Sequence, residues 1–202
     1  IMPLPRREER QVESQSLSVR SKLTDFFKAL ICDLWDIMKT IVEVTAVVIV
    51  LTQVFIVSSF IPTSSMSPTV SKGSLMLCLR TDYWVNTPQR GDIVVFRRDD
   101  GNYTLYAKRV VGIPGDTVEI IHGVTYINGE KYDEPWLTET PIDEVFEPFE
   151  VPAGEYFCMG DNRNHSYDCR YWEETYVPEE NILARGRIAI NVKDKAIKLF
   201  QY

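Results

Sequence analysis

The chain has 202 residues, which is enough for one domain with a hydrophobic core and one further segment. Its composition is that of an ordinary folded protein, with 25% charged residues and a net charge of -7. By direct count, residues 1–61 hold seven basic and seven acidic side chains, and residues 62–202 hold fifteen and twenty-two. The excess negative charge therefore lies in the C-terminal part, which argues against nucleic acid as its partner.

The cysteines and histidines form no metal-binding pattern. Cys32, Cys78, Cys158 and Cys169 never form a CxxC pair, and the two histidines lie far apart. We therefore expect no metal and no other cofactor. For Cys158 and Cys169, both a disulfide and a pair of small buried thiols are open, and buried thiols are the simpler interpretation.

The N-terminal third predicts a tail and two helical segments. Residues 1–16 are polar, charged and proline-containing, which is typical of a disordered tail. Over residues 17–39, apolar side chains recur at three- and four-residue spacing, which predicts an amphipathic helix. With two Phe and one Trp on its apolar face, this helix either lies flat on a membrane, or packs on protein, or simply extends the next helix.

Residues 40–60 predict a single transmembrane helix. Its apolar part, residues 41–60, corresponds to about 30 Å of helix, which matches the hydrocarbon core of a bilayer. A cleaved signal peptide and a buried core helix are the alternatives, but the run is too long for the first and no A-x-A-like site follows. The basic residues before the run favour a cytoplasmic N-terminus, with residues 61–202 on the outer face of the cell membrane.

Residues 61–202 predict a mainly β catalytic domain with an antiparallel sheet and a smaller β lobe at about 117–158. Short β-branched and aromatic runs alternate with Gly, Pro, Asp and Asn, and helical periodicity is nearly absent. Asn128-Gly129 is a hairpin signal. The strand-like runs cover residues 73–80, 92–98, 103–113, 116–129, 155–161 and 187–192.

Ser65 is a candidate nucleophile because it follows the apolar run so closely. Residues 61–65 span at most about 17 Å, so the serine would act near the bilayer surface on a membrane-associated substrate. Its hydroxyl needs a base at neutral pH. A Ser-His-Asp arrangement with His122 or His165 is one option, although His122-Gly123 has the pattern of an exposed turn.

Lys108 is the base that the sequence favours. On a strand, Tyr106 and Val110 flank Lys108 on one face, and apolar or aromatic neighbours lower the pKa of a lysine. Bringing that pKa from about 10.4 to about 8 takes about 3 kcal/mol, which burial can supply. The alternative is an edge-strand lysine that only discourages aggregation. A third segment, residues 160–170, has the composition of a polar structural loop in which Asp168 and Arg170 pair.

Four segments together resemble the sequence boxes of the bacterial type I signal peptidases, membrane serine proteases that cleave signal peptides from exported preproteins. They are IPTSSMSPT (61–69), RGDIVVF (90–96), YAKRVVGIPGD (106–116) and GDNRNHSYDCRYW (160–172). The match runs in the right order over nearly all of residues 40–190. It implies a hydrolase whose partners are signal peptides, the lipid bilayer and, indirectly, the secretion translocon.

The resemblance also implies a role for each candidate residue. Ser65 is the nucleophile, Lys108 is the general base of a Ser-Lys dyad, and Thr63 with the Ser65 N–H forms an oxyanion hole. Ser166 hydrogen-bonds the lysine amine, and the residues that hold the scaffold are Asp168, Arg170 and Arg109. The shallow pockets for small substrate residues are lined by Ile61, Met66, Val70, Tyr106 and Ala107.

Some positions depart from the family pattern, and two other functions remain open. Asn164 and His165 stand where Asp and Asn are usual, Cys169 replaces a common Ser, and Glu173 replaces Gly. One alternative is a self-cleaving Ser-Lys protease of the LexA type, against which the membrane run counts. The other is a non-catalytic relative for pilus assembly or chaperoning, against which the presence of both Ser65 and Lys108 counts.

Overall fold

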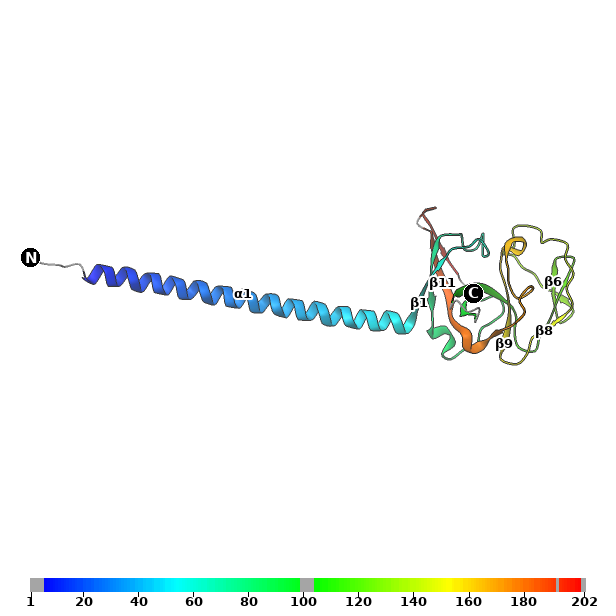
Figure 1. Cartoon of the computed structure of the whole chain (residues 1–202), viewed down its shortest axis with the longest axis horizontal. Helices are drawn as coiled ribbons and strands as arrows, with labels where there is room; N and C mark the ends of the chain where they lie inside the picture. The colour runs from blue at the N-terminus through cyan, green and yellow to red at the C-terminus, as the bar shows by residue number, and fades with distance from the viewer. Residues whose placement is uncertain (1–5, 99–103, 192, 201–202) are drawn as a thin grey trace, which may run out of the picture. The chain divides into compact units, whose positions relative to one another are not determined.

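The structure, a computed structural model, describes residues 6–98, 104–191 and 193–200 (Figure 1). Along the start of the helix, side chains are described only at residue 20 and from residue 22 onward. The chain forms two compact units, Ile1–Leu51 and Thr52–Tyr202.

The N-terminal part is one continuous helix, α1, from Arg6 to Phe55. Of the tail predicted at residues 1–16, residues 1–5 lie outside the described residues, and the prediction is wrong for residues 6–16. Arg, Glu and Gln are good helix formers, and no Gly or Pro occurs between residues 6 and 55. For the same reason the segments expected at 17–39 and 40–60 are joined without a break.

The helix ends before the predicted position. Residues 56–60 were expected in the transmembrane helix, but they belong to strand β1, Ile56–Ile61. All six residues of β1 pair with strand β2 (Ser74–Leu79), and alternate side chains of β1 are buried. Pairing with β2 therefore stabilises this segment as a strand and not as a continuation of the helix. The stretch Lys22–Phe55 is long and apolar enough to cross a membrane. Its side chains are exposed from Lys22 to Val54.

The second unit is built of antiparallel β-strands, which confirms the mainly β prediction. The larger sheet has the order β1-β2-β11-β3-β4-β9-β10, and β12 pairs with β11. Figure 1 shows this sheet beside the smaller one. Its strands after β1 are β2 (Ser74–Leu79), β3 (Ile93–Arg97), β4 (Leu105–Gly112), β9 (Glu155–Met159), β10 (Val177–Pro178), β11 (Ile182–Asn191) and β12 (Ala196–Leu199).

The smaller sheet has the order β7-β6-β5-β8. Asn128 and Gly129 both have positive φ (54° and 81°), as the hairpin signal predicts. The small lobe ends at β8, and β9 belongs to the larger sheet, so the expected boundary near residue 158 moves to residue 150. The four strands are β5 (Thr117–Ile121), β6 (Val124–Ile127), β7 (Glu130–Lys131) and β8 (Phe149–Glu150).

The core lies on both faces of the central strands. In β3, Val94 and Phe96 belong to one buried cluster, and Ile93 and Val95 belong to the other. A strand covered on both faces needs a continuous apolar run, which is what this segment contains. The part of the chain that the structure describes also contains three short 3-10 turns: η1 (Thr81–Tyr83), η2 (Arg163–His165) and η3 (Glu179–Asn181).

Candidate active site

Ser65 lies in a tight turn that follows β1. The N–H of Ser67 donates to the carbonyl of Ser64 at 2.9 Å, which turns the chain at the serine. The carbonyl of Ser65 accepts from the N–H of Asn162 at 3.0 Å. The amide of Asn162 also donates to the Ser64 carbonyl at 3.2 Å. Ser65 is therefore held by the loop that follows β9, almost one hundred residues further along the chain.

Two hydrogen-bond donors lie next to the candidate nucleophile. Thr63 Oγ1 is 3.2 Å from Ser65 Oγ. Among the described residues, the N–H of Ser65 has no hydrogen-bond acceptor. The Thr63 hydroxyl and the Ser65 N–H are the donor types that stabilise the oxyanion of an acyl-transfer intermediate.

Lys108 is buried in the interior of the larger sheet. Its strand, β4, lies between β3 and β9, and the lysine is only 3% exposed. The edge-strand alternative is therefore wrong. Burial lowers the pKa of Lys108, and the nearby Asp168 carboxylate offsets part of this effect. The sequence-based expectation of a lysine with a lowered pKa agrees with this environment.

One pocket of about 370 Å³ brings most of the predicted residues together. Ser65, Thr63 and Lys108 line it with Ile61, Tyr106 and Ala107. Among the described residues, no hydrogen bond joins Ser65 to Lys108, although both side chains open into this space. Hydrogen bonds of this kind are often loose before a substrate binds. Met66 and Val70 were expected in the pocket lining, but both are fully buried in the core.

Gly160 brings the β9 loop into contact with the serine. It lies one residue beyond Met159, which pairs with Arg109, so Gly160 stands beside Lys108 at the end of the ladder. A Cβ atom on Gly160 would collide with the carbonyl of Ser65 and with the hydroxyl of Ser166. Only glycine permits this approach.

Ser166 lies at this contact without its expected hydrogen bond. Its side chain is buried, and its Oγ has no hydrogen-bond partner among the described residues. The expected bond to the Lys108 amine is therefore not formed in this structure. A buried hydroxyl without a partner is unusual in a folded protein.

Arg109 forms a buried ion pair with Asp161. Arg109 Nε is 2.8 Å from Asp161 Oδ1 and Nη2 is 2.6 Å from Oδ2, and both side chains have no exposed surface. The guanidinium also donates to the Gly91 carbonyl at 2.7 Å and lies 4.1 Å from the ring of Trp136. This two-point contact connects β4 to the loop that holds Ser65.

Asp168 and Arg170 form the second ion pair, as predicted. Arg170 Nε donates to Asp168 Oδ1 at 2.8 Å, and the Gly160 N–H donates to Asp168 Oδ2 at 2.9 Å. Burial alone would raise the pKa of Asp168, but the guanidinium and the backbone N–H outweigh it and lower the pKa. Asp168 therefore remains a carboxylate close to Lys108.

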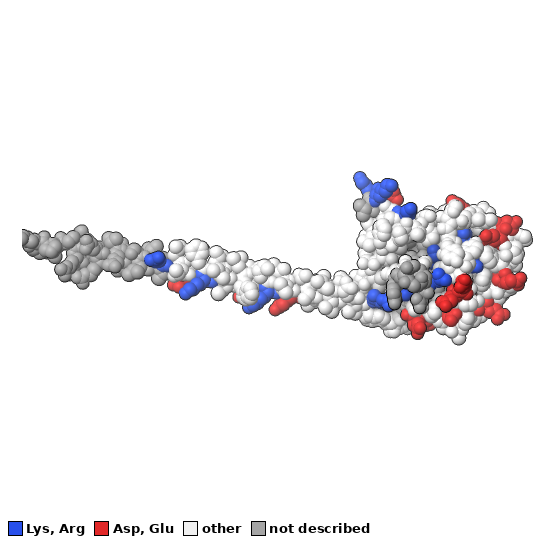
Figure 2. Space-filling model, viewed as in Figure 1, with Lys and Arg blue, Asp and Glu red and all other residues white. Residues whose placement is uncertain are grey.

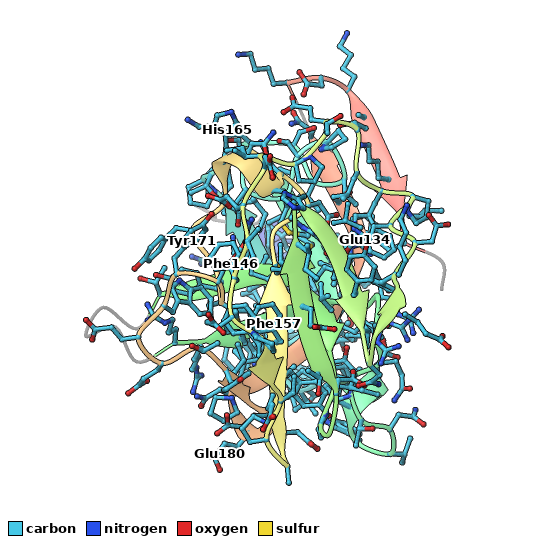
Figure 3. The ribbon with its side chains drawn as sticks, turned by 90° about the vertical axis from the view of Figure 1, so that its right-hand side faces the viewer. Glu134, Phe146, Phe157, His165, Tyr171 and Glu180 are labelled. Atoms are coloured by element: carbon cyan, nitrogen blue, oxygen red, sulfur yellow. The ribbon has the colours of Figure 1, made fainter. Side chains whose placement is uncertain are left out.

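A third ion pair was not predicted from the sequence. Arg163 donates to Glu134 through two guanidinium nitrogens, and to the Gly160 carbonyl at 3.1 Å. Glu134 follows β7 in the small lobe (Figure 3). Arg163 lies within the recognised GDNRNHSYDCRYW segment, so its position carried a signal. No local sequence pattern identified Glu134 as a site residue, because its partner Arg163 lies 29 residues away along the chain.

Asn164, one of the departures from the family pattern, has a local explanation. Its Oδ1 accepts from the Ile142 N–H at 2.9 Å, and its Nδ2 donates to the Thr140 carbonyl at 3.1 Å. An aspartate could make only the first of these bonds. The segment that contains Thr140 and Ile142 is also held by Phe146, whose ring centre lies 5.6 Å from that of Tyr171 (Figure 3).

Cys158 and Cys169 are free thiols, which agrees with the simpler of the two sequence interpretations. The Cys158 N–H donates to Cys169 Sγ at 3.1 Å. Burial raises the pKa of both thiols, so both remain protonated. The cysteine at position 169 thus acts as a hydrogen-bond acceptor for the backbone of β9.

The two histidines do not form a Ser-His-Asp triad. His122 lies in the β5–β6 turn, where its Nδ1 is 2.6 Å from Asp143 Oδ1 and both side chains are exposed. His165 lines the same pocket as Ser65 (Figure 3 labels it), but it makes no side-chain hydrogen bond to Ser65 or to an acid among the described residues.

The chain is similar in sequence to the proteins of one family. The family model described as "Signal peptidase, peptidase S26" matches residues 34–190. A probable signal peptidase I-2 from Synechocystis sp. is 38% identical over 132 residues, which is 63% of this chain and 59% of that protein. Signal peptidase I of Leptolyngbya laminosa is 38% identical over 134 residues, 63% of this chain and 64% of that protein. The chain thus spans less than two thirds of these two relatives.

A third relative is covered more fully. Signal peptidase I of Bacillus licheniformis is 33% identical over 168 residues, which is 78% of this chain and 83% of that protein. A solved structure of a signal peptidase I from Enterococcus faecalis V583 is 32% identical, with a TM-score of 0.42, and the match covers 50% of this chain and 97% of that one.

Proposed function

The chain belongs to the signal peptidase family, peptidase S26, and from this premise we propose that it is a membrane-bound serine endopeptidase. Its substrates are exported preproteins, and it cleaves their N-terminal signal peptides through an acyl-enzyme on Ser65. The observation that carries the proposal is a buried lysine, Lys108, in the same pocket as a serine, Ser65. Such a lysine serves as general base without any histidine or metal.

The reaction follows from the two side chains. Neutral Lys108 takes the proton of the Ser65 hydroxyl while Ser65 Oγ attacks the scissile carbonyl carbon. The resulting oxyanion is stabilised by the Ser65 N–H and the Thr63 hydroxyl. The ammonium of Lys108 then gives its proton to the leaving amine as the C–N bond breaks. In the second half, Lys108 takes a proton from a water molecule as the water oxygen attacks the ester carbonyl carbon, and the Lys108 ammonium then returns that proton to Ser65 Oγ as the C–O bond breaks.

The surroundings of the pocket favour small substrate side chains. Ile61, Tyr106 and Ala107 line it together with Phe60 and Leu105. β1 lies at the edge of the larger sheet, and the register of β4 with β9 begins only at Arg109, so the end of β1 and the start of β4 offer backbone edges along which an extended peptide fits. The buried pairs of Arg109 and Arg170 hold the loop that positions Ser65.

The proposed topology places the active site at a membrane surface. The chain is membrane-anchored, since it carries an N-terminal helix that is long and apolar enough to span a bilayer. We propose that it crosses the cell membrane once, with a cytoplasmic N-terminus and the β domain on the outer face. Its partners are then signal peptides, the lipid bilayer and, indirectly, the secretion translocon.

A cleavage assay with the full chain in detergent, on a preprotein that carries a signal peptide, tests the proposal. Ser65→Ala and Lys108→Ala are each expected to lower kcat by at least about 1,000-fold, because the nucleophile and base act as a unit. Lys108→Arg should be equally inactive, since a guanidinium stays charged. Lys131→Ala, on the exposed β7 strand, is the matched control and should cleave normally.

Two outcomes would contradict the proposal. Near-normal cleavage by Lys108→Ala would remove the lysine from the mechanism. A wild-type chain that is folded but inert on every preprotein would instead favour a non-catalytic relative. Thermal unfolding of each variant separates loss of chemistry from loss of fold.

A further inference from the structure

A long connection in the small lobe, residues 132–148, joins β7 to β8. All of its residues are described, and it contains neither helix nor strand. Loops longer than about 12–15 residues without secondary structure are uncommon in compact domains, and those that are ordered usually serve a function. We call this connection the strap. Its contacts show which parts of the domain it joins.

Both ends of the strap are fixed to the small sheet by backbone hydrogen bonds. At its start, the N–H of Tyr132 donates to the carbonyl of Thr125 in β6 at 2.9 Å. Near its end, the N–H of Phe146 donates to the carbonyl of Ile120 in β5 at 3.1 Å. The strap is therefore part of the small lobe.

The same strap also contacts the β9 loop, in the same order along both segments. Glu134, near the start of the strap, binds Arg163. The middle of the strap binds Asn164 through the two backbone groups described above. Near the end of the strap, Glu144 Oε2 accepts from the hydroxyl of Tyr171 at 2.7 Å. The strap therefore connects the small sheet to the loop that holds the candidate nucleophile.

The contact made by Glu134 is buried. Figure 2 shows acidic side chains gathered on the surface of the β domain, where water solvates them. The side chains of Glu134 and Arg163 are instead only 5% and 4% exposed. Arg163 Nη1 is 2.7 Å from Glu134 Oε2, and Nη2 binds Oε1, so the pair is bidentate. Two parallel bonds fix the plane of a guanidinium as well as its position.

The oriented guanidinium holds the backbone of Gly160. Arg163 Nε donates to the Gly160 carbonyl at 3.1 Å, and Nη1 donates to Thr125 Oγ1 at 3.1 Å. Gly160 in turn lies directly against the Ser65 carbonyl. A continuous series of contacts therefore leads from Glu134 through Arg163 and Gly160 to the segment of the nucleophile.

Trp136 gives the strap a second contact near the site. Its ring lies 4.1 Å from the guanidinium of Arg109, the residue that follows Lys108 in β4. The indole N–H of Trp136 is buried and has no hydrogen-bond partner among the described residues, so the ring is held by stacking. The strap thus touches β4 as well as the β9 loop, and these two elements carry the general base and hold the nucleophile.

We propose that Glu134 is a positioning residue for catalysis, through which the strap sets the position of Ser65 relative to Lys108. Glu134 does not line the pocket that contains these two side chains, so its carboxylate does not touch the reacting atoms. It acts by orienting Arg163, which holds the Gly160 carbonyl. The inference rests on the proposed peptidase function, because kcat is its main readout.

The first test compares Glu134→Gln with the wild-type full chain on a preprotein in detergent, well below the Tm of either protein. An amide has one acceptor oxygen in place of two, so the bidentate pair is lost. Displacing Ser65 by about 1 Å should lower kcat on the order of 100-fold, with KM unchanged within about twofold. Glu147→Gln, at an exposed position of the same strap, is the matched control and should keep the wild-type kcat.

A second variant separates positioning from stability. Glu134→Gln leaves the Arg163 charge buried without its partner, so it should also lower Tm. Glu134→Leu/Arg163→Met removes both charges, and its Tm should lie closer to that of the wild type. The Gly160 carbonyl loses its oriented donor in both variants, so kcat should stay low in both. If kcat recovered together with Tm, the pair would only stabilise the fold and the proposal would be wrong.

A third measurement reads the site without a preprotein. In a Cys32→Ser/Ser65→Cys chain, the three remaining cysteines are buried, and the new thiol shares its pocket with Lys108. A nearby ammonium promotes thiol ionisation, so adding Lys108→Met should slow alkylation by iodoacetamide at pH 7 about tenfold. With Glu134→Gln also present, this effect should fall below about threefold, because the two groups have moved apart. Glu147→Gln should leave the full effect in place.

Two further results would overturn the proposal. One is a Glu134→Gln chain with wild-type kcat and KM, and the other is an effect of Lys108→Met on alkylation that Glu134→Gln leaves unchanged. A wild-type chain that cleaves no preprotein would instead contradict the proposed function. The alkylation rates would then still decide whether Glu134 positions Ser65.

Discussion

Gly160 lies so close to the Ser65 carbonyl that no side chain fits between them. The backbone of Gly160 also donates to Asp168 Oδ2 at 2.9 Å, and its carbonyl accepts from Arg163 at 3.1 Å. One glycine therefore touches the nucleophile segment, the buried Asp168–Arg170 pair and the unpredicted Arg163–Glu134 pair. The position of Ser65 depends on the packing of this loop as much as on its own strand.

Gly160→Ala is accordingly expected to lower kcat on the order of 100-fold, because displacing a catalytic group by about 1 Å has that effect. The added methyl group must push the Ser65 segment away from Lys108. Steady-state cleavage by the full chain measures the loss. Gly186→Ala is the control, since the nearest neighbour of its new Cβ is the flexible Met76 side chain at 3.2 Å. Equal kinetics for wild type and Gly160→Ala would show that the contact does not position the serine.

Thr63→Val tests the oxyanion hole. The substitution keeps the shape of the side chain but removes the hydroxyl that lies 3.2 Å from Ser65 Oγ. Loss of one oxyanion donor lowers kcat by about 100- to 1,000-fold with little change in KM. Thr63→Ser retains the hydroxyl and should keep most of the activity. If Thr63→Val changed KM alone, the side chain would contact the substrate and not the transition state.

The buried Arg109–Asp161 pair is expected to matter for stability. Asp161→Asn leaves a guanidinium uncompensated in a fully buried place, which costs about 3–5 kcal/mol of unfolding free energy. The Arg187–Asp82 pair is partly exposed, so Asp82→Asn should cost less than about 1 kcal/mol. Denaturant unfolding followed by tryptophan fluorescence measures both. A loss of similar size in the two variants would mean that burial of the first pair is not what makes it important.

The sequence was sufficient to predict the antiparallel β domain and the Ser65–Lys108 pocket, because strand alternation and the four boxes are local signals. It failed where the signal is not local. Residues 56–60 are apolar and continuous with the helix, and only pairing with β2 makes them a strand. Met66 resembles a pocket residue by position, but the turn after Ser65 directs it into the core. Glu134 is recognised only once the fold brings it to Arg163.

The pH dependence of cleavage follows from the burial of Lys108. Burial lowers the pKa of this lysine below its usual value, and only the neutral amine takes the Ser65 proton. The value of kcat/KM should therefore rise as the pH increases through the lowered pKa and then level off. A profile from pH 6 to 11 on the full chain measures this. A rate that begins to rise only above pH 10 would contradict a buried neutral amine.

The same burial predicts that Lys108 lowers the stability of the fold at neutral pH. The folded-state pKa lies below the unfolded value of 10.5, so between the two the unfolded chain binds more protons than the folded one. Stability should then rise with pH across that window. Lys108→Met removes the buried amine, so it should raise Tm at pH 7 and flatten the dependence of Tm on pH, although it abolishes cleavage. Melting curves of both proteins at several pH values give the answer, with Lys131→Met as the exposed control. A lower Tm for Lys108→Met at pH 7 would mean that Asp168 more than compensates for burial, and the lysine would then be charged in the folded protein.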